Sequence, residues 1–134
     1  MQEVRPVLVV DDDADGRELL AEAFTSEGYT VLTAANGREA LDLLTTAGQI
    51  EPLIIILDME MPIMSGWEFL HTIRRYHRLA AIPVVVQSGS PSATEGHRPG
   101  AVSAFLTKPY DAYALVARVK RGEFGSVAGS LVPI

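Results

Sequence analysis

The sequence predicts an α/β protein with a doubly wound, five-stranded parallel sheet. Short apolar runs alternate along the chain with segments that carry apolar residues at helical spacing. One of these runs, residues 53–57, is apolar at every position, which is typical of a central parallel strand covered on both faces. Strands and helices that alternate in this way form right-handed crossovers, which place helices on both faces of the sheet.

Three strands and two helices are expected in the first half of the chain. In order, they are the strand 7–10, the helix 14–27, the strand 29–33, the helix 38–46 and the strand 53–57. The first helix has Leu20, Ala23 and Phe24 at helical spacing, and Gly28 ends it. The second helix has three apolar residues on one side and is closed by Gly48.

Two further strands and two further helices are expected in the second half. In order, they are the helix 65–78, the strand 84–87, the strand 104–107 and the helix 110–121. The helix 65–78 directs Phe69, Leu70 and Ile73 inward, and Pro83 precedes the fourth strand. The last helix again carries three apolar residues at helical spacing.

Two stretches depart from this alternation. From Ser90 to Gly100 the chain holds two prolines and two glycines, and its only apolar side chain besides the prolines is Ala93. A helix there would have no face to bury, so we expect at most a short helical turn. Residues 122–134 are rich in Gly and Ser and lack periodicity, so they are expected to be a flexible tail or linker after a domain that spans 1–121.

Composition excludes several kinds of function. The 134 residues include no cysteine, so the chain has no disulfide and no zinc or redox thiol site. A net charge of −6 argues against direct binding of nucleic acid, and the helix dipole explains the basic cluster Arg74, Arg75, His77 and Arg78 at the expected end of the third helix. No stretch is apolar for long enough to span a bilayer and no signal peptide is recognisable, so a cytoplasmic location is expected.

Polar residues follow four of the five strands. Ligands of an open parallel sheet bind beyond the carboxyl ends of its strands. The first strand delivers Asp11 and Asp12 to that edge, and the third delivers Asp58. The fourth and fifth strands deliver Ser88 and Lys108. Three carboxylates, a hydroxyl and an ammonium group are therefore expected to converge.

This set of groups suits phosphoryl chemistry with a hard cation. Carboxylates with no histidine or thiolate beside them favour Mg²⁺. Asp58 ends the most buried strand and is the natural nucleophile, because a carboxylate can form an aspartyl phosphate. The metal and Lys108 would neutralise the phosphoryl oxygens, and Ser88 would donate a hydrogen bond to the attached group.

Four motifs in this order resemble the receiver domain of two-component response regulators. They are VVDDDADGR, ILDMEMPIMSG, PVVVQSGS and FLTKPY, and the resemblance runs from about Val4 to Arg121. It implies a flavodoxin-like fold with strand order 2-1-3-4-5, in which the fourth helix would here be short or irregular. It also implies that the chain is no enzyme towards other substrates and catalyses only its own phosphorylation and dephosphorylation.

The resemblance also implies the roles of the metal-site residues. Asp58 would accept the phosphoryl group from the phosphohistidine of a histidine kinase or phosphotransfer protein. Asp11 and Asp12 would bind Mg²⁺ together with Asp58 and the backbone carbonyl of Glu60. Lys108 would pair with the acceptor and then with the phosphate.

Further positions are implied to serve the switch. Ser88 matches the family's Ser/Thr and Phe105 its switch aromatic, although an aromatic at the start of a last strand can also be plain core. Two backbone features are implied as well: the Lys108-Pro109 peptide would be cis, and Gly66 would end the acceptor loop, where a residue free to take a positive φ is useful. The switched surface would contact a downstream protein target or an output domain. The sequence leaves the oligomeric state open. It also leaves open whether the chain is a single-domain regulator or part of a larger protein.

The four aspartates after the first strand divide into two pairs under this resemblance. Arg17 sets the register that selects Asp11 and Asp12 as the acidic pair. Asp13 is then the N-cap of the first helix, and Asp15 lies in its first turn, where the helix dipole favours a negative charge.

Two alternatives belong to other classes. A haloacid-dehalogenase-type phosphatase uses two acids with the spacing of Asp11 and Asp13, but the chain has little room for the cap domain that such an enzyme needs. A receiver-like binding module that works without phosphorylation is the other alternative. Each of these polar residues could also, taken alone, be a turn, cap or surface residue.

Overall fold

The computed structural model describes residues 5–46, 50–89 and 102–124. Its five parallel strands form one sheet in the order β2-β1-β3-β4-β5. The strands are β1 (Val7–Val10), β2 (Val31–Ala34), β3 (Ile54–Asp58), β4 (Val84–Ser88) and β5 (Ala104–Thr107). The helices are α1 (Ala14–Ser26), α2 (Gly37–Thr46), α3 (Gly66–Ile73) and α4 (Ala112–Lys120).

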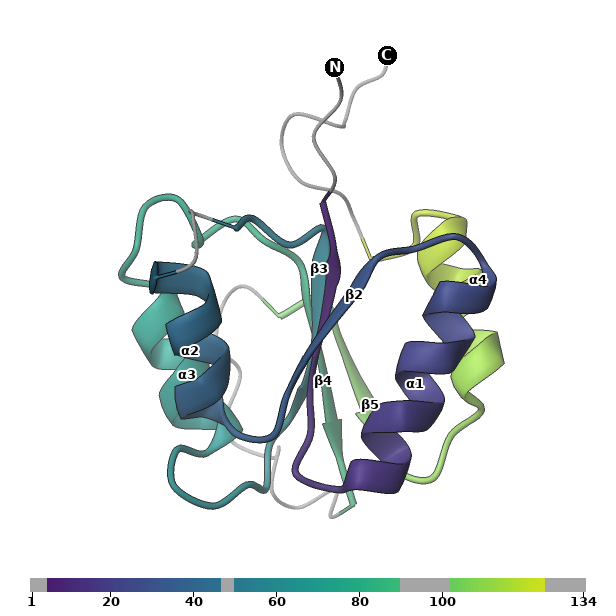
Figure 1. Ribbon diagram of the computed structural model, residues 1–134, viewed down its shortest axis with the longest axis horizontal. Coiled ribbons are helices and arrows are strands. Elements are labelled where there is room, and N and C mark those ends of the chain that lie inside the picture. Colours follow the sequence, from purple (N-terminus) through teal and green to yellow (C-terminus); the bar gives the residue numbers. More distant parts are fainter. Residues whose placement is uncertain (1–4, 47–49, 90–101, 125–134) are drawn as a thin grey trace.

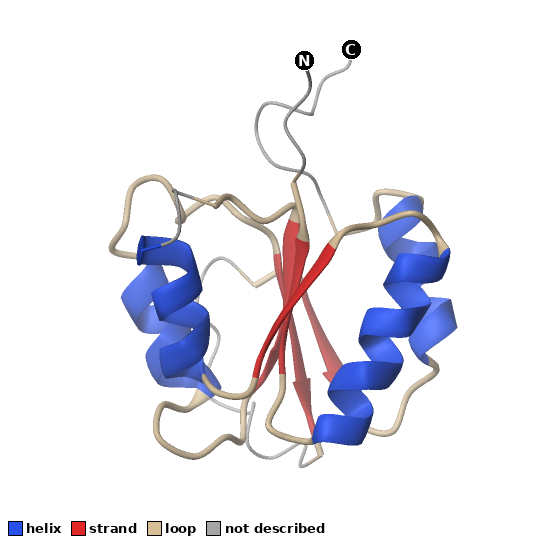
Figure 2. Ribbon diagram, in the orientation of Figure 1, coloured by secondary structure: helices blue, strands red, loops and turns tan. Residues whose placement is uncertain are grey.

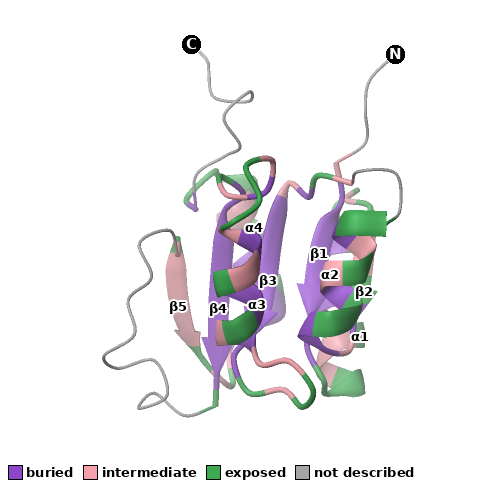
Figure 3. Cartoon of the chain, turned by 90° about the vertical axis from the view of Figure 1, so that its left-hand side faces the viewer, coloured by how far each residue is buried: buried purple, intermediate pink, exposed green. Residues whose placement is uncertain are grey.

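The sheet lies between two layers of helices. Helices α1 and α4 cover one face, and α2 and α3 cover the other (Figure 1, Figure 2). Each face has its own apolar cluster, because side chains alternate along a strand: Val7 and Val9 pack towards α1 and α4, while Leu8 and Val10 pack towards α2 and α3. Every residue of β1, β3 and β4 is buried (Figure 3). The doubly wound fold and its predicted strand order are confirmed.

Strand register brings three polar residues to the same level of the sheet. Val10 pairs with Leu57, so Asp11 lies level with Asp58, and Asp58 pairs in turn with Gln87. The residues two positions earlier in these strands pack on the face covered by α1 and α4; they are Val9, Ile56 and Val85. Because side chains repeat every two residues, the three polar side chains point to that same face at the carboxyl end of the sheet.

Side-chain caps define the helix starts. Asp13 is the N-cap of α1, and its carboxylate accepts a hydrogen bond of 3.2 Å from the backbone N–H of Gly16. Ser65 and Glu68 form a reciprocal capping box at the start of α3. Gly28 follows the end of α1 with a φ of +93°, a conformation that glycine adopts readily.

Helix α3 ends earlier than the sequence predicts. The expected helix ran to Arg78, whereas α3 ends at Ile73 and continues as tighter turns, with Arg75 N–H donating to Thr72 and Tyr76 N–H to Ile73. These turns bury Leu79 and Ile82 under the sheet, and that burial outweighs the helical propensity of the segment. The basic cluster therefore begins at Arg74, the C-cap of α3, and its other members, Arg75, His77 and Arg78, follow the helix.

Arg78 serves a different purpose from the one expected. Its guanidinium donates to the carbonyl of Leu44 at 2.6 Å and to that of Ile50 at 2.9 Å. Because Leu44 lies in the last turn of α2, this arginine satisfies a carbonyl at the end of another helix.

Several predictions concern residues that the structure does not describe. The short or irregular fourth helix expected at 90–100 lies outside the described residues, as does most of the tail. The last described residue, Phe124, is buried in the cluster under α1 and α4, and the division of the chain at residue 121 stays a prediction. None of the helices within 5–46, 50–89 and 102–124 is long and apolar enough to cross a bilayer.

Candidate functional site

Three carboxylates converge at the carboxyl end of the sheet. Ligand oxygens of Asp11, Asp12 and Asp58 all lie within 4.8 Å of one another. Asp11 and Asp58 are almost fully buried, whereas Asp12 is exposed. Buried like charges are unfavourable unless a cation lies among them. Because the donor atoms are all oxygens and one of the three groups faces solvent, the cluster fits Mg²⁺, which prefers carboxylates and keeps several waters.

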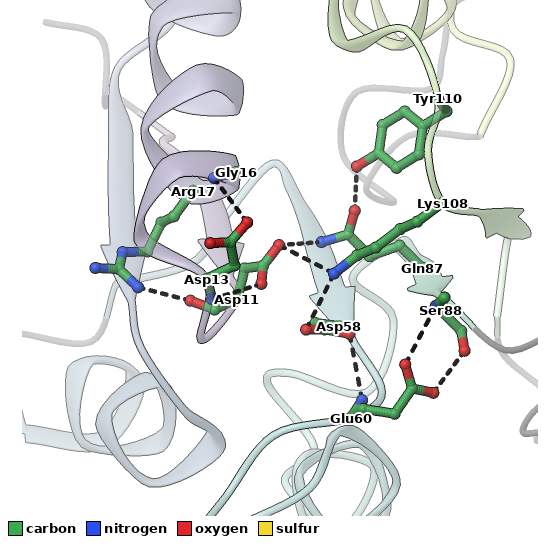
Figure 4. A network of polar contacts seen from close by, with 11 residues as sticks. Asp11, Asp13, Gly16, Arg17, Asp58, Glu60, Gln87, Ser88, Lys108 and Tyr110 are labelled. Carbon is green, nitrogen blue, oxygen red and sulfur yellow. Dashed lines mark hydrogen bonds and ion pairs between the residues drawn. The ribbon is translucent and has the colours of Figure 1, made fainter.

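Asp58 lies at the centre of this cluster. Its Oδ1 accepts a hydrogen bond of 3.2 Å from the backbone N–H of Glu60, and its Oδ2 lies 3.3 Å from Nζ of Lys108 (Figure 4). The pKa of Asp58 is raised to about 7, first because the carboxyl is buried and next because the charge of Asp11 lies beside it, while Lys108 opposes the shift.

Among the described residues, Lys108 is the cationic side chain that pairs with these carboxylates. Its Nζ lies 3.3 Å from Asp58 and 3.5 Å from Asp11. Burial alone would lower the pKa of Lys108, but the two carboxylates outweigh burial and raise it above its usual value. The backbone N–H of Lys108 donates to the carbonyl of Ser88, which fixes its strand end against β4. The cis peptide predicted between Lys108 and Pro109 is confirmed.

The start of α1 holds Asp11 in place. The guanidinium of Arg17 donates to the backbone carbonyl of Asp11 at 2.7 Å, and the backbone N–H of Asp13 donates to Oδ1 of Asp11 at 3.0 Å. Asp13 itself caps α1, and Asp15 lies in its first turn. The predicted helix-start roles of Asp13 and Asp15 are confirmed, and the metal-site role of Asp11 and Asp12 stays a prediction.

The Ser88 hydroxyl is hydrogen-bonded to the carboxylate of Glu60. Its Oγ donates to Oε2 of Glu60 at 2.5 Å, and the N–H of Gly89 donates to Oε1 of the same carboxylate at 3.2 Å. Ser88 is buried, and this carboxylate is one of its partners.

A match to a family model identifies the protein family of this chain. Residues 7–120 match the family described as the response regulator receiver domain. The chain belongs to this family. The recognition made from the four sequence motifs is thereby confirmed.

Curated relatives of this receiver are larger proteins. The chain is 32% identical over 117 residues to the sensor histidine kinase CheAY of Helicobacter pylori, a match that covers 86% of this chain and 14% of that protein. It is also 32% identical over 114 residues to the transcriptional regulatory protein CpxR of Escherichia coli, which covers 85% of this chain and 47% of that protein. The receiver thus spans less than half the length of these relatives.

Solved receiver structures match over nearly their whole length. The chemotaxis response regulator CheY4 of Vibrio cholerae is 30% identical with a TM-score of 0.76, over 89% of this chain and 98% of that chain. The response regulator TrrA of Thermotoga maritima, in complex with Mg²⁺-BeF, is 30% identical with a TM-score of 0.74, over 88% of this chain and 98% of that chain. These likenesses confirm the flavodoxin-like fold.

The roles that the resemblance implied for Phe105 and for the backbone carbonyl of Glu60 stay predictions. Phe105 is half-buried in β5, opposite Val86, and packs against the cluster under α2 and α3. This position is compatible with a switch aromatic and with plain core, so its role stays a prediction. The backbone carbonyl of Glu60 likewise stays a predicted metal ligand.

Gly66 does not use the freedom to take a positive φ that was expected to be useful there. The positive φ in the loop after β3 falls on Ile63, at 68°. Gly66 is needed for space, because a Cβ there would lie 2.4 Å from the carbonyl oxygen of Asp58 and 2.8 Å from Cα of Met59. The loop therefore packs directly on the backbone of Asp58 and Met59.

Gln87 and Tyr110 join the site without having been predicted. Gln87 is almost fully buried, donates from Nε2 to Oδ2 of Asp11 at 3.0 Å, and accepts a hydrogen bond from the hydroxyl of Tyr110 (Figure 4). Burial and the nearby carboxylates raise the pKa of Tyr110. One sequence feature could have indicated Gln87 as a site residue: it is the single amide in the strand VVVQS, whose other residues before Ser88 are all valine.

Proposed function

We propose that this receiver accepts a phosphoryl group on Asp58 in a Mg²⁺-dependent reaction and thereby switches its contacts with other proteins. The observation that carries the proposal is the buried Asp58 carboxylate, which lies 3.3 Å from Lys108 and within 4.8 Å of two further carboxylates. A nucleophile, a fixed cation and a set of hard ligands are the groups that phosphoryl transfer requires.

The transfer step is a displacement at phosphorus. An oxygen of Asp58 forms a bond to phosphorus while the bond from phosphorus to the donor's imidazole nitrogen breaks, and the electron pair stays on that nitrogen. Lys108 lies where its charge offsets the charge of the incoming phosphoryl oxygens. Asp11, Asp12 and Asp58 would hold Mg²⁺, which supplies further neutralisation of those oxygens.

The donor is a phosphohistidine of a histidine kinase or a phosphotransfer protein. Support comes from the family and from relatives such as CheAY and TmoS, both of which are named sensor histidine kinases. Mg²⁺ as the cofactor is supported by the oxygen-only cluster and by the Mg²⁺-BeF complex of TrrA. The setting proposed for this chemistry is the cytoplasm, and the protein acts on no substrate other than itself.

The switch transmits phosphorylation through Ser88. A phosphoryl group on Asp58 adds charged acceptor oxygens that compete with the Glu60 carboxylate for the Ser88 hydroxyl, and phosphorylation draws Ser88 from Glu60 towards Asp58. The phosphate shifts the equilibrium only by the contacts it gains in the switched state. Phe105 follows this movement, and the changed surface contacts a downstream protein target or an output domain.

The phosphatase alternative loses its main support. It required Asp13 as a second catalytic acid, but the carboxylate of Asp13 caps α1. The binding module that works without phosphorylation is distinguished by experiment.

Phosphoramidate tests the proposal directly, because it contains the same phosphorus–nitrogen bond as phosphohistidine. Incubation with phosphoramidate and Mg²⁺ should yield an acyl phosphate that is visible by ³¹P NMR. No acyl phosphate should form when EDTA is added beforehand. Absence of any acyl phosphate with this donor and with acetyl phosphate would favour the module that works without phosphorylation.

A further inference from the structure

Gln87 is a buried polar side chain in a strand that is otherwise apolar up to Ser88. Strand β4 reads VVVQS, and all its residues are buried between the two helical layers. Only 1% of the Gln87 surface is exposed. A buried amide is unfavourable unless both its ends are hydrogen-bonded, so a valine would be the less costly residue here.

Both ends of the Gln87 amide have partners, and these partners determine its orientation. Nε2 lies 3.0 Å from Oδ2 of Asp11, and Oε1 accepts from the hydroxyl of Tyr110. An ionised carboxylate can only accept hydrogen bonds, so the NH₂ end must face Asp11. The carbonyl end then faces Tyr110, whose hydroxyl must be the donor. The chain Tyr110–Gln87–Asp11 therefore has one direction.

This chain joins Asp11 to the segment that carries Lys108. Tyr110 lies two residues after Lys108, in the connection between β5 and α4. Asp11 is thus linked to that segment twice: through its ion pair of 3.5 Å with Lys108 and through the neutral chain of Gln87 and Tyr110. Gln87 and Lys108 meet the same atom, Oδ2 of Asp11, while Oδ1 accepts from the N–H of Asp13.

We propose that Gln87 is a positioning residue of the receiver site: its amide fixes the orientation of the Asp11 carboxylate for Mg²⁺ and, through Tyr110, ties the segment that carries Lys108 to it. The proposal rests on the proposed function, because it assigns Asp11 to the metal site. Partners that hydrogen-bond to a metal-binding carboxylate typically change metal affinity by about 10- to 100-fold when they are removed.

Gln87→Met removes the amide and keeps the side-chain volume, so the strand can remain packed. Oδ2 of Asp11 then loses a donor and Tyr110 loses its acceptor. We expect the Kd for Mg²⁺ to rise by about 10-fold or more. Tyr110→Phe removes only the hydroxyl and leaves the contact of Gln87 with Asp11, so a smaller rise is expected.

The test is calorimetric titration of the full chain with MgCl₂, with thermal unfolding measured on each protein. Single and double variants at Gln87 and Tyr110 should be non-additive: the double variant should bind Mg²⁺ as weakly as Gln87→Met alone, because both changes interrupt one chain. The matched control is Tyr113→Phe, which removes a hydroxyl from an exposed tyrosine of α4 and should leave Kd unchanged.

A spectroscopic readout separates positioning from general destabilisation. In ¹⁵N NMR spectra, the side-chain NH₂ resonances of Gln87, identified by comparison with the Gln87→Met protein, should shift on addition of Mg²⁺ and also in Tyr110→Phe. If Gln87→Met does not fold, the Kd of Tyr110→Phe for Mg²⁺ carries the test, and a Kd equal to that of the unaltered protein overturns the proposal.

The outcomes distinguish the inference from the proposed function. If the unaltered protein binds Mg²⁺ and is phosphorylated, but Gln87→Met binds Mg²⁺ within twofold of it or the NH₂ resonances do not respond to the metal, the positioning role is overturned and the receiver function stands. If the unaltered protein neither binds Mg²⁺ nor accepts phosphate, the proposed function itself fails.

Discussion

The hydroxyl of Ser88 donates a 2.5 Å hydrogen bond to the carboxylate of Glu60, which also accepts from the N–H of Gly89. Glu60 is anchored in turn, because its own N–H donates to Oδ1 of Asp58. One side chain therefore holds the hydroxyl that the proposed switch draws towards Asp58. Under the proposed function, a phosphoryl group on Asp58 competes with Glu60 for Ser88.

Weakening this contact should favour the switched state. In Glu60→Gln the acceptor loses its charge, and hydrogen bonds to charged groups are stronger than those to neutral ones. We expect beryllofluoride with Mg²⁺ to bind this variant more tightly, by about three- to tenfold. Calorimetric titration measures this affinity. Glu60→Asp keeps the charge but shortens the reach, so a similar gain in that variant would assign the effect to the lost contact. Unchanged binding in both variants would show that Glu60 does not restrain Ser88.

The pKa of Asp58 predicts how stability depends on pH without metal. Its folded-state pKa of about 7 lies above the ordinary value of 3.8, so between these values the folded protein binds more protons than the unfolded chain. The free energy of unfolding should therefore fall as pH rises from about 4 to about 7 and then level off. Asp58→Asn should remove this dependence and be more stable at pH 8, by about 1–3 kcal/mol. Urea unfolding in EDTA at pH 5 and at pH 8 measures the difference in the free energy of unfolding between Asp58→Asn and the unaltered protein. Equal differences at both pH values would mean that Asp58 is not the titrating group.

Lys108 should matter for the response rather than for metal binding. Lys108→Met removes the ammonium group that lies beside Asp58 and Asp11 but leaves all three carboxylates in place. Mg²⁺ should still bind, as followed by the fluorescence of Trp67, the only tryptophan. Beryllofluoride should no longer change the NMR shifts of Ser88 and Phe105.

The control for this prediction is Lys120→Met, which removes an exposed ammonium group paired with Glu27 on the surface. It should behave as the unaltered protein does. A normal response in Lys108→Met would remove Lys108 from the switch.

Asp12 and Asp13 are neighbours, but their substitutions should affect different properties: Mg²⁺ affinity for Asp12 and stability for Asp13. Asp13→Ala removes the N-cap of α1 and should lower the free energy of unfolding by about 1 kcal/mol, with Mg²⁺ binding nearly unchanged. Asp12→Ala should weaken Mg²⁺ binding strongly and leave stability nearly unchanged, because Asp12 is an exposed member of the carboxylate cluster. Urea unfolding and calorimetry on both proteins check this. Equal losses of Mg²⁺ affinity would contradict the division between metal site and cap.

The fold and the centre of the site could be predicted because they depend on local patterns and one topological rule. Alternating apolar runs define the strands, and residues after parallel strands share one edge of the sheet. That rule was sufficient to bring together Asp11, Asp58 and Lys108, which lie far apart in the sequence. The cap role of Asp13 followed from the register that the resemblance to receiver domains gave the aspartates.

Contacts that depend on side-chain reach across the sheet could not be predicted. Gln87 meets Asp11 only because the register places β4 and β1 on either side of Asp58, at the same level. The early end of α3 follows from the burial of Leu79 and Ile82, which no helical pattern records. Gly66 was expected to serve backbone freedom and instead provides space beside Asp58.

Intact mass after incubation with acetyl phosphate and Mg²⁺ tests the central claim most directly. The unaltered protein should gain the mass of one phosphoryl group, lose it again in hydroxylamine, and gain nothing when EDTA is present. Asp58→Asn should gain nothing under any of these conditions. Phosphate incorporation that persists in Asp58→Asn, or that forms equally well without Mg²⁺, would contradict the assignment of Asp58 as the acceptor in a magnesium-dependent receiver.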